Sequence, residues 1–325
     1  MLVVAVYFIN DPFKVLYHYD SYFTSAQNYP IILDKDYVSS RTFLQNNSKY
    51  HYDSYIFGNS RSGNFLINDW KQHINSDKCF HFDGSCESLY NIEKNIAFIK
   101  KNGGYIKNAL FVLDPNILYG VTENKGHLFI LDPLASGGSK LEFQLVFLKD
   151  YLEPAFIKQY FSYLIRHKLN PKYEVPVGGM LNYARDTRLY DPVTNEIYYQ
   201  GLEEAIARNR DSFFDSRSNY FTKRDTVQQY SEVIIGGKQI ALLNSIKSML
   251  NEDHAQYKII LSPLYSQVKL NEKDIKALCD IFGKENVFDF SGINDITNNM
   301  YNYYESYHYR PEVAKLMMDS IYRSK

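Results

Sequence analysis

The sequence predicts an α/β fold built on a parallel sheet. Two observations indicate it: short apolar runs alternate with amphipathic segments of helical length, and this pattern occurs in both the first and the last third of the 325-residue chain. Such alternation is typical of strands joined by crossover helices. Right-handed crossovers would bring the carboxyl ends of the strands to one edge of the sheet, where ligands bind in folds of this class.

The expected elements of the first third are three strands and two helices. The apolar run 55–57 predicts a strand that stops at Gly58, and a helix is expected over 64–73. A second strand, 79–82, leads to a helix over 89–101, where Ile92, Ile96 and Ile99 give an apolar face. A third strand is expected over 110–113.

The last third repeats the pattern. A long helix over 238–250 follows the Gly236-Gly237 pair, and a strand over 257–261 comes next. A helix over 272–282, a strand over 287–290 and a final helix over 310–322, with Pro311 at its start, complete the set. The Gly236-Gly237-Lys238 sequence lacks the upstream glycine of a phosphate loop, so no nucleotide site is expected.

Residues 117–229 form an insertion between the two halves of this pattern. Residues 141–169 carry Phe, Leu and Tyr at helical spacing, whereas 170–224 are polar and rich in turn residues. An insertion that leaves the sheet after Asn116 is placed to form a mostly helical cap over the carboxyl edge, and caps select substrates and exclude water. The alternative is that these helices only extend the core.

Composition and charge exclude several function classes. With 36 basic and 37 acidic residues the formal charge is −1, which gives no bulk attraction to nucleic acid or to an anionic membrane. The histidines show no metal-ligand spacing, so we expect neither a metal nor another cofactor. Cys79, Cys86 and Cys279 form no disulfide framework. Cys79 and Cys86 could pair in an oxidising compartment, but unpaired thiols are the simpler expectation.

The N-terminal segment, 1–52, begins with the apolar run 2–9 and breaks at Asn10-Asp11-Pro12. The run is too short to span a bilayer and is compatible with a buried strand or helix. It is equally compatible with the end of a membrane anchor, which would place the protein in the cell envelope, on the extracytoplasmic side of a bacterial membrane. A cytoplasmic location stays open.

Two short motifs at opposite ends of the chain suggest nucleophilic catalysis. Ser60, in Gly58-Asn59-Ser60-Arg61, follows an expected strand, so its hydroxyl should be exposed on a turn. Near the C-terminus, Glu305 precedes His308 by three residues, a spacing that brings both side chains to one face of a turn or a first helical turn. A serine, a histidine and an orienting acid are the parts of an activated nucleophile.

Each of these residues also has a plainer interpretation. Ser60 could be an ordinary helix N-cap, and Glu305 could be a charge favourable to the helix macrodipole. Arg61 could bind an anionic substrate group, although an internal salt bridge is the simpler role. Asp114 and Asp295 are reserve candidates for the orienting acid.

The order of these motifs resembles the SGNH (GDSL-like) hydrolase superfamily, with Gly58-Asn59-Ser60 at the position of its Gly-Asp-Ser and Glu305-x-x-His308 at the position of its Asp-x-x-His. The resemblance covers 53–116 and 230–325. It implies a three-layer α/β/α core with a flavodoxin-like parallel sheet, and Ser60 as nucleophile, His308 as base and Glu305 as orienting acid. It also implies an oxyanion hole formed by the Ser60 N–H, the Gly84 N–H and the Asn116 amide.

The function that the resemblance implies is a serine ester hydrolase or O-acyltransferase. The 30 tyrosines, which offer a stacking face and a polar tip, suit a carbohydrate groove, although they could equally be core and surface residues. Together with the possible envelope anchor, they favour acyl esters, acetyl above all, of cell-envelope carbohydrate as substrates. The alternative is a catalytically inactive SGNH-like scaffold that binds a glycan or a membrane acyltransferase partner, and the Asn59 and Glu305 substitutions favour it.

Overall fold

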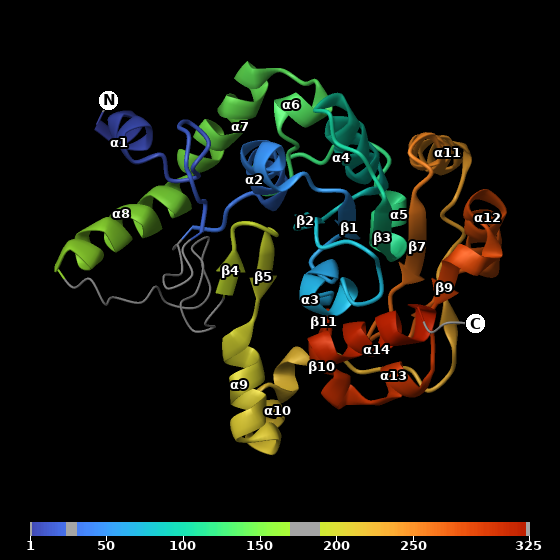
Figure 1. Ribbon diagram of the computed structural model, residues 1–325. Helices are drawn as coiled ribbons and strands as arrows, with labels where there is room; N and C mark the ends of the chain where they lie inside the picture. Colours follow the sequence, from blue (N-terminus) through green and yellow to red (C-terminus); the bar gives the residue numbers. More distant parts are fainter. Residues whose placement is uncertain (1, 24–30, 170–188, 323–325) are drawn as a thin grey trace.

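The computed structural model describes residues 2–23, 31–169 and 189–322 (Figure 1). A parallel sheet of five strands lies at its centre, in the order β2-β1-β3-β7-β9. The strands are β1 (Ser54–Gly58), β2 (Cys79–Asp83), β3 (Asn108–Leu113), β7 (Gln256–Leu261) and β9 (Val287–Asp289). The predicted α/β class and the parallel sheet are therefore confirmed.

Alternate side chains of the strands enter two separate apolar clusters. Tyr55 and Phe57 of β1 pack with α2 (Lys35–Tyr50), α4 (Leu89–Lys101), α11 (Gly237–Glu252) and α12 (Glu272–Phe282). Ile56, between them in the sequence, packs instead with α3 (Ile67–Trp70) and α14 (Pro311–Tyr322). Every residue of β1 is buried, as expected for a strand covered on both sides. Because α2 supplies Phe43 to the first cluster, a helix that precedes residue 53 also packs on the sheet.

The helix predicted over 64–73 is wrong as a continuous element. The chain instead forms a 3-10 turn, Ser62–Asn64, and then the short helix α3. Ser62 donates both its backbone N–H and its hydroxyl to the Asn59 carbonyl oxygen, each at 2.8 Å, which fixes a tight turn. Gly63, Asn64, Asn68 and Asp69 are poor helix formers that favour such turns.

The N-terminal apolar run is a helix, α1 (Leu2–Asn10), and it ends where Asp11 adopts a positive φ of 40°. Its one buried side chain, Tyr7, packs with Phe13 and with helices of the insertion. Within the described residues, no helix is long and apolar enough to cross a membrane.

The insertion divides into two parts that pack in different places. Its first part comprises α5 (Pro115–Tyr119), α6 (Pro133–Ser136), α7 (Lys140–Tyr151) and α8 (Pro154–Leu169). Helices α7 and α8 pack against α1 and Tyr37 (Figure 1). Of the polar half, 170–188 lies outside the described residues. The rest comprises the hairpin β4 (Leu189–Asp191) and β5 (Glu196–Tyr198), α9 (Gln200–Arg208), α10 (Arg210–Ser216) and the 3-10 turn Ser218–Tyr220.

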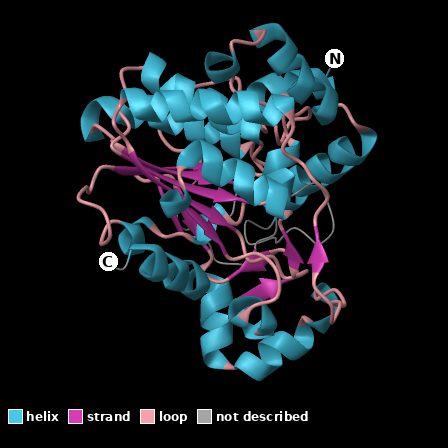
Figure 2. Ribbon diagram, turned by 90° about the vertical axis from the view of Figure 1, so that its right-hand side faces the viewer, coloured by secondary structure: helices cyan, strands magenta, loops and turns pink. Residues whose placement is uncertain are grey.

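The hairpin and the two helices of this second part approach the sheet and the C-terminal region. In the turn between β4 and β5, the Thr194 carbonyl oxygen accepts the backbone N–H of His81 at 2.9 Å. His81 belongs to β2, which is an edge strand of the sheet. Helices α9 and α10 pack against Tyr304, which belongs to a small hairpin of β10 (Tyr303–Glu305) and β11 (His308–Tyr309). Figure 2 shows α9 and α10 below the sheet, next to this hairpin.

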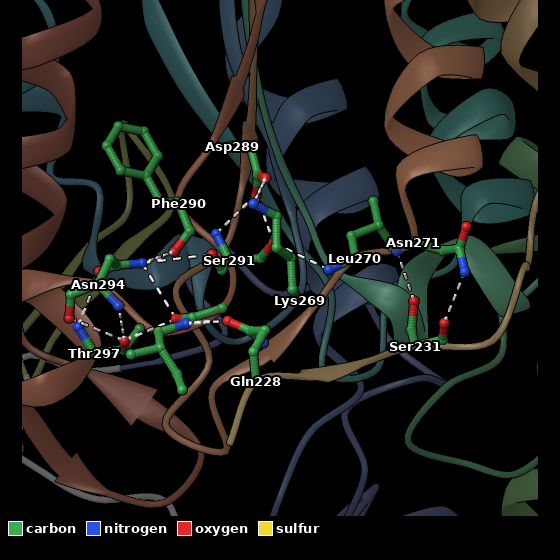
Figure 3. A network of polar contacts seen from close by, with 12 residues as sticks. Gln228, Ser231, Lys269, Leu270, Asn271, Asp289, Phe290, Ser291, Asn294 and Thr297 are labelled. Atoms are coloured by element: carbon green, nitrogen blue, oxygen red, sulfur yellow. Dashed lines mark hydrogen bonds and ion pairs between the residues drawn. The ribbon is translucent and has the colours of Figure 1, made fainter. Parts of the chain in front are cut away.

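The chain returns from the insertion through a polar network (Figure 3). Strand β6 (Gln229–Tyr230) pairs in parallel with β8 (Val268–Lys269). The Gln228 side chain accepts the Ile293 N–H at 2.7 Å, and the Ser231 hydroxyl accepts the Asn271 N–H at 3.0 Å. The remaining elements, the 3-10 turns Lys284–Asn286 and Met300–Asn302 and helix α13 (Asp295–Asn298), lead to the hairpin. The network thus anchors the end of the insertion to the loops beyond β7 and β9.

Candidate active site

Ser60 lies on the turn that follows β1, at the carboxyl end of the sheet. It is half-buried, and its neighbours Asn59 and Arg61 are buried. The Asn59 side-chain oxygen accepts the Arg61 N–H at 3.1 Å, and this bond together with the two bonds from Ser62 to the Asn59 carbonyl closes the turn. The turn therefore presents the Ser60 hydroxyl on a rigid backbone.

His308 and Glu305 face each other across the β10–β11 hairpin. The sequence predicted a turn or a first helical turn, and the structure forms the contact by antiparallel pairing of Glu305 with His308. The hairpin tip is anchored to the insertion, because the Ser306 N–H and hydroxyl both donate to the Tyr220 carbonyl oxygen, at 3.2 and 3.0 Å. The Arg310 guanidinium, just beyond the hairpin, forms a two-point ion pair with Glu203 of α9, at 3.0 and 2.7 Å.

The three predicted triad residues come together. His308 Nε2 lies 2.9 Å from Ser60 Oγ, and His308 Nδ1 is hydrogen-bonded to Glu305 Oε1. The second oxygen of Glu305 accepts the Tyr307 N–H at 2.8 Å, which fixes the carboxylate. Because a carboxylate can only accept, Nδ1 carries the hydrogen and Nε2 of the neutral ring is left to accept the Ser60 proton. This is the arrangement of an activated nucleophile.

Arg61 links this site together through an internal salt bridge with Asp114, the simpler of the two roles expected from the sequence. Its Nη1 and the Asn59 amide both donate to Asp114 Oδ2, each at 2.6 Å, and its Nε donates to the Tyr307 carbonyl oxygen at 2.9 Å. The other oxygen of Asp114 caps helix α5. A single guanidinium therefore ties the serine turn and the end of β3 to the loop that carries His308. Asp114 is thereby fully engaged away from the imidazole.

We predict that Arg61→Met destabilises the protein by about 3 kcal/mol, because the buried Asp114 carboxylate loses its positively charged partner. The side chain of Arg61 is 11% exposed and that of Asp114 is 1% exposed, so solvent cannot replace the lost partner. Arg61→Lys should recover part of the loss, since it keeps the charge without the planar fork. The free energy of unfolding in urea measures both, with exposed Arg208→Met as a matched control. A loss for Arg61→Met no larger than for the control would refute this role.

A second serine–histidine contact lies beneath the turn. Ser62 Oγ is 2.8 Å from His81 Nε2, and both residues are almost fully buried. Because the single Ser62 hydroxyl hydrogen is donated to Asn59, His81 Nε2 must be the donor in this pair. The polarity is thus opposite to that of a base activating a serine, and the pair supports the turn.

Burial lowers the pKa of His81 to about 4, with opposing influences from Asp83, which raises it, and Lys35, which lowers it. The ring is therefore neutral in the folded protein, and its contribution to stability is present above an unfolded pKa of about 6.5. That contribution is lost as the pH falls from 6.5 towards 4 and is on the order of 3 kcal/mol. His81→Gln should remove this term.

The measurement is the difference in unfolding free energy between the parent and His81→Gln from pH 8 to pH 4. Burial and the Asp83 charge raise the pKa of Asp36 to about 7, and burial with the Asp36 charge raises that of Glu87, so these carboxyls favour folding as the pH falls. The difference between the two proteins cancels their effect. The prediction fails if the difference stays constant over this range.

One of the three predicted oxyanion donors is occupied in this structure. The Gly84 N–H donates to the Gly58 carbonyl oxygen at 3.3 Å, continuing the β1–β2 pairing, so in this conformation it is not free to bind an oxyanion. Asn116 lies in the first turn of α5 with an exposed side chain. Within the described residues, neither the Ser60 N–H nor the Asn116 side-chain amide has a hydrogen-bond partner.

A pocket of about 200 Å³ opens beside His308. The C-terminal hairpin contributes Tyr304, Glu305 and His308, and the remaining lining comes from the serine side and the insertion, namely Asn64, Tyr199, Leu202 and Arg217. A larger pocket, of about 680 Å³, lies at the opposite end of the sheet around the first residues of β3 and β7 and contains none of the predicted site residues. We therefore regard the smaller pocket as the one connected with the triad.

Asp295 is the first residue of α13, where it follows the Asn294 cap. Cys79, Cys86 and Cys279 are all free thiols. Among the described residues, no group of three or more His, Cys, Asp or Glu side chains could hold a metal ion.

Comparison with protein-family models and with curated protein sequences found no match for this chain. Its functional assignment therefore depends on the geometry described above.

Proposed function

We propose that the protein is an SGNH-type serine ester hydrolase or O-acyltransferase. The observation that carries the proposal is the continuous contact from Ser60 Oγ through His308 to Glu305, with 2.9 Å between the hydroxyl and the imidazole. The strand order β2-β1-β3-β7-β9 supports a flavodoxin-like sheet, and the two apolar clusters support a three-layer α/β/α core. The segment around α9 and α10, which borders His308, would be the part of the insertion that acts as a cap.

In the proposed mechanism, His308 Nε2 removes the Ser60 proton as Ser60 Oγ attacks the ester carbonyl carbon. The tetrahedral intermediate collapses when the imidazolium returns that proton to the departing alcohol oxygen, which leaves an acyl-serine. Water or a second alcohol, deprotonated by His308, then attacks the acyl-serine and regenerates Ser60. Glu305 would hold the Nδ1–H tautomer and stabilise the imidazolium during both steps.

The oxyanion would be stabilised by the Ser60 N–H and the Asn116 side-chain amide, both of which are available. Gly84 could join them only after its bond to the Gly58 carbonyl opens, and that bond, at 3.3 Å, is slightly longer than the usual range. Each such donor is typically worth about 3 to 4 kcal/mol in the transition state. Release of the Gly84 N–H from the Gly58 carbonyl oxygen on substrate binding would therefore have a large effect on turnover.

The substrate class that the site favours is a small acyl ester of a carbohydrate. A pocket of about 200 Å³ is smaller than those that usually hold drug-sized ligands, and Tyr199 and Tyr304 in its wall offer aromatic surface. Envelope association would come through α1, whose Leu2, Phe8 and Ile9 are exposed.

The test is hydrolysis of p-nitrophenyl acetate and of acetylated sugars by the purified protein, with Ser60→Ala as the comparison. The alternative is a catalytically inactive SGNH-like scaffold that binds a glycan or a membrane acyltransferase partner. The engaged Gly84 N–H favours it, because an oxyanion donor is occupied. Glycan binding without ester turnover would support that alternative.

A further inference from the structure

His308 and Glu305 both line the pocket of about 200 Å³, which makes it the candidate place for the alcohol part of an ester. In the proposed mechanism the imidazolium returns its proton to the leaving oxygen, so that oxygen has to come within hydrogen-bond reach of His308 Nε2. The acyl group is attached to Ser60 on the other side of the reacting carbon. If the alcohol part occupies this pocket, the chemistry of the lining residues selects the alcohol.

Arg217 brings a guanidinium to this pocket, and no carboxylate of the described chain forms an ion pair with it. Its Nε donates to the Tyr304 carbonyl oxygen at 3.2 Å, and its guanidinium stacks near the rings of Phe213 and Tyr220, with 5.1 and 5.0 Å to the ring centroids. These contacts hold the half-buried side chain in place. These contacts do not use the two terminal nitrogens of Arg217, Nη1 and Nη2. Together these nitrogens form a planar pair of hydrogen-bond donors.

The two carboxylates near the pocket, those of Glu305 and Glu203, already have other hydrogen-bond or ion-pair partners. Glu305 binds His308 and the Tyr307 N–H, and Glu203, behind the pocket wall, is paired with Arg310 and also accepts the Tyr304 hydroxyl. Arg217 is thus the guanidinium among the lining residues, and it forms no ion pair within the described residues, whereas the Glu305 carboxylate is held by hydrogen bonds from His308 and from the Tyr307 N–H. Fixed guanidinium forks of this kind bind carboxylate and phosphate groups with two parallel hydrogen bonds.

We propose that this pocket recognises an anionic group, a carboxylate or a phosphate, on the alcohol part of the substrate, and that Arg217 is the residue that binds it. The inference rests on the proposed function for the direction of the ester. The remaining wall, Asn64, Tyr199 and Leu202, offers one amide, one aromatic face and one aliphatic side chain. This combination suits a single acidic sugar ring better than a lipid chain, which would need a longer apolar wall.

Binding can be measured without turnover in the Ser60→Ala protein by isothermal titration calorimetry with methyl glucuronide, methyl glucoside 6-phosphate and neutral methyl glucoside. We expect at least one of the two anionic ligands to bind about tenfold or more tightly than the neutral one, as a charge-assisted pair in a partly buried site provides. Which of the two binds better distinguishes a carboxylate from a phosphate. Arg217→Gln should abolish the preference, and Arg217→Lys should retain part of it. Exposed Arg208→Gln, at the end of α9, is the matched control and should keep it.

The same preference should appear in kcat/KM when the wild-type protein acts on acetylated glucuronide and acetylated glucoside. Turnover of both esters at equal kcat/KM, together with equal binding of charged and neutral ligands, would overturn the inference and leave the proposed function intact. Charge-selective binding that depends on Arg217, without any ester turnover, would support the anionic pocket and refute the hydrolase proposal.

Discussion

Ser60→Ala is expected to lower kcat for p-nitrophenyl acetate by about 10⁴-fold or more, because loss of the nucleophile removes the acyl-serine route altogether. The fold should be retained, since the Ser60 hydroxyl is half-buried and its hydrogen-bond partner is His308, itself partly exposed. Stopped-flow or steady-state release of p-nitrophenol measures the loss.

Two other serines serve as controls for this prediction. Ser320→Ala, on the exposed side of α14, should keep the parental rate. Ser62→Ala tests the neighbouring buried serine and should act on stability, because Ser62 closes the turn through Asn59. Normal turnover by Ser60→Ala together with loss of turnover in Ser62→Ala would show that the nucleophile has been misassigned.

Glu305→Gln is expected to lower kcat by about 10³ to 10⁴-fold, because an amide stabilises the imidazolium poorly and can hold the wrong tautomer. Glu305→Asp should have a smaller effect, roughly ten- to a hundredfold, since it keeps the charge but withdraws the carboxylate by one methylene from His308 and the Tyr307 N–H. The comparison separates charge from length. The ratio of kcat values for the two variants is the quantity to measure.

A Glu305→Gln protein as active as the parent would show that Glu305 does not orient the imidazole. Ser60 and His308 would then act as a dyad, and neither reserve acid offers a ready replacement: Asp114 is bound by Arg61 and Asn59, and Asp295 opens α13. The matched control is Glu312→Gln, whose parent side chain lies on the surface and pairs with Arg310.

The contact of Ser60 with His308 and of His308 with Glu305 was predictable from the sequence, because the three residues occupy recognisable places. Ser60 follows a buried strand, and a three-residue spacing from Glu305 to His308 keeps the pair together on a helical turn or, as found, across a two-residue hairpin. The parallel sheet could also be predicted, since its strands are apolar runs that alternate with amphipathic helices. Hydrophobic periodicity specifies the sheet, and the two short motifs specify the three site residues.

Other parts of the site had no signal in the sequence. Arg61 acts through the carbonyl oxygen of Tyr307, and backbone acceptors are not visible in residue types. The Gly84 N–H is occupied because of the register between β1 and β2, which depends on the tertiary pairing. The helix expected over 64–73 failed because side-chain bonds from Ser62 to Asn59 compete with helical ones. Arg217 becomes part of the pocket only through the packing of α9 and α10 against Tyr304.

The most direct test of the central claim is covalent labelling by a fluorophosphonate probe, which phosphonylates a serine only when a base activates it. Intact-mass analysis of the native protein should show one probe per chain, and peptide mapping should place it on Ser60. Heat-unfolded protein and the His308→Ala variant should remain unlabelled, because both lack the imidazole at 2.9 Å from the hydroxyl. Absence of labelling in the native protein, or labelling at another serine, would contradict the assignment of Ser60 as an activated nucleophile.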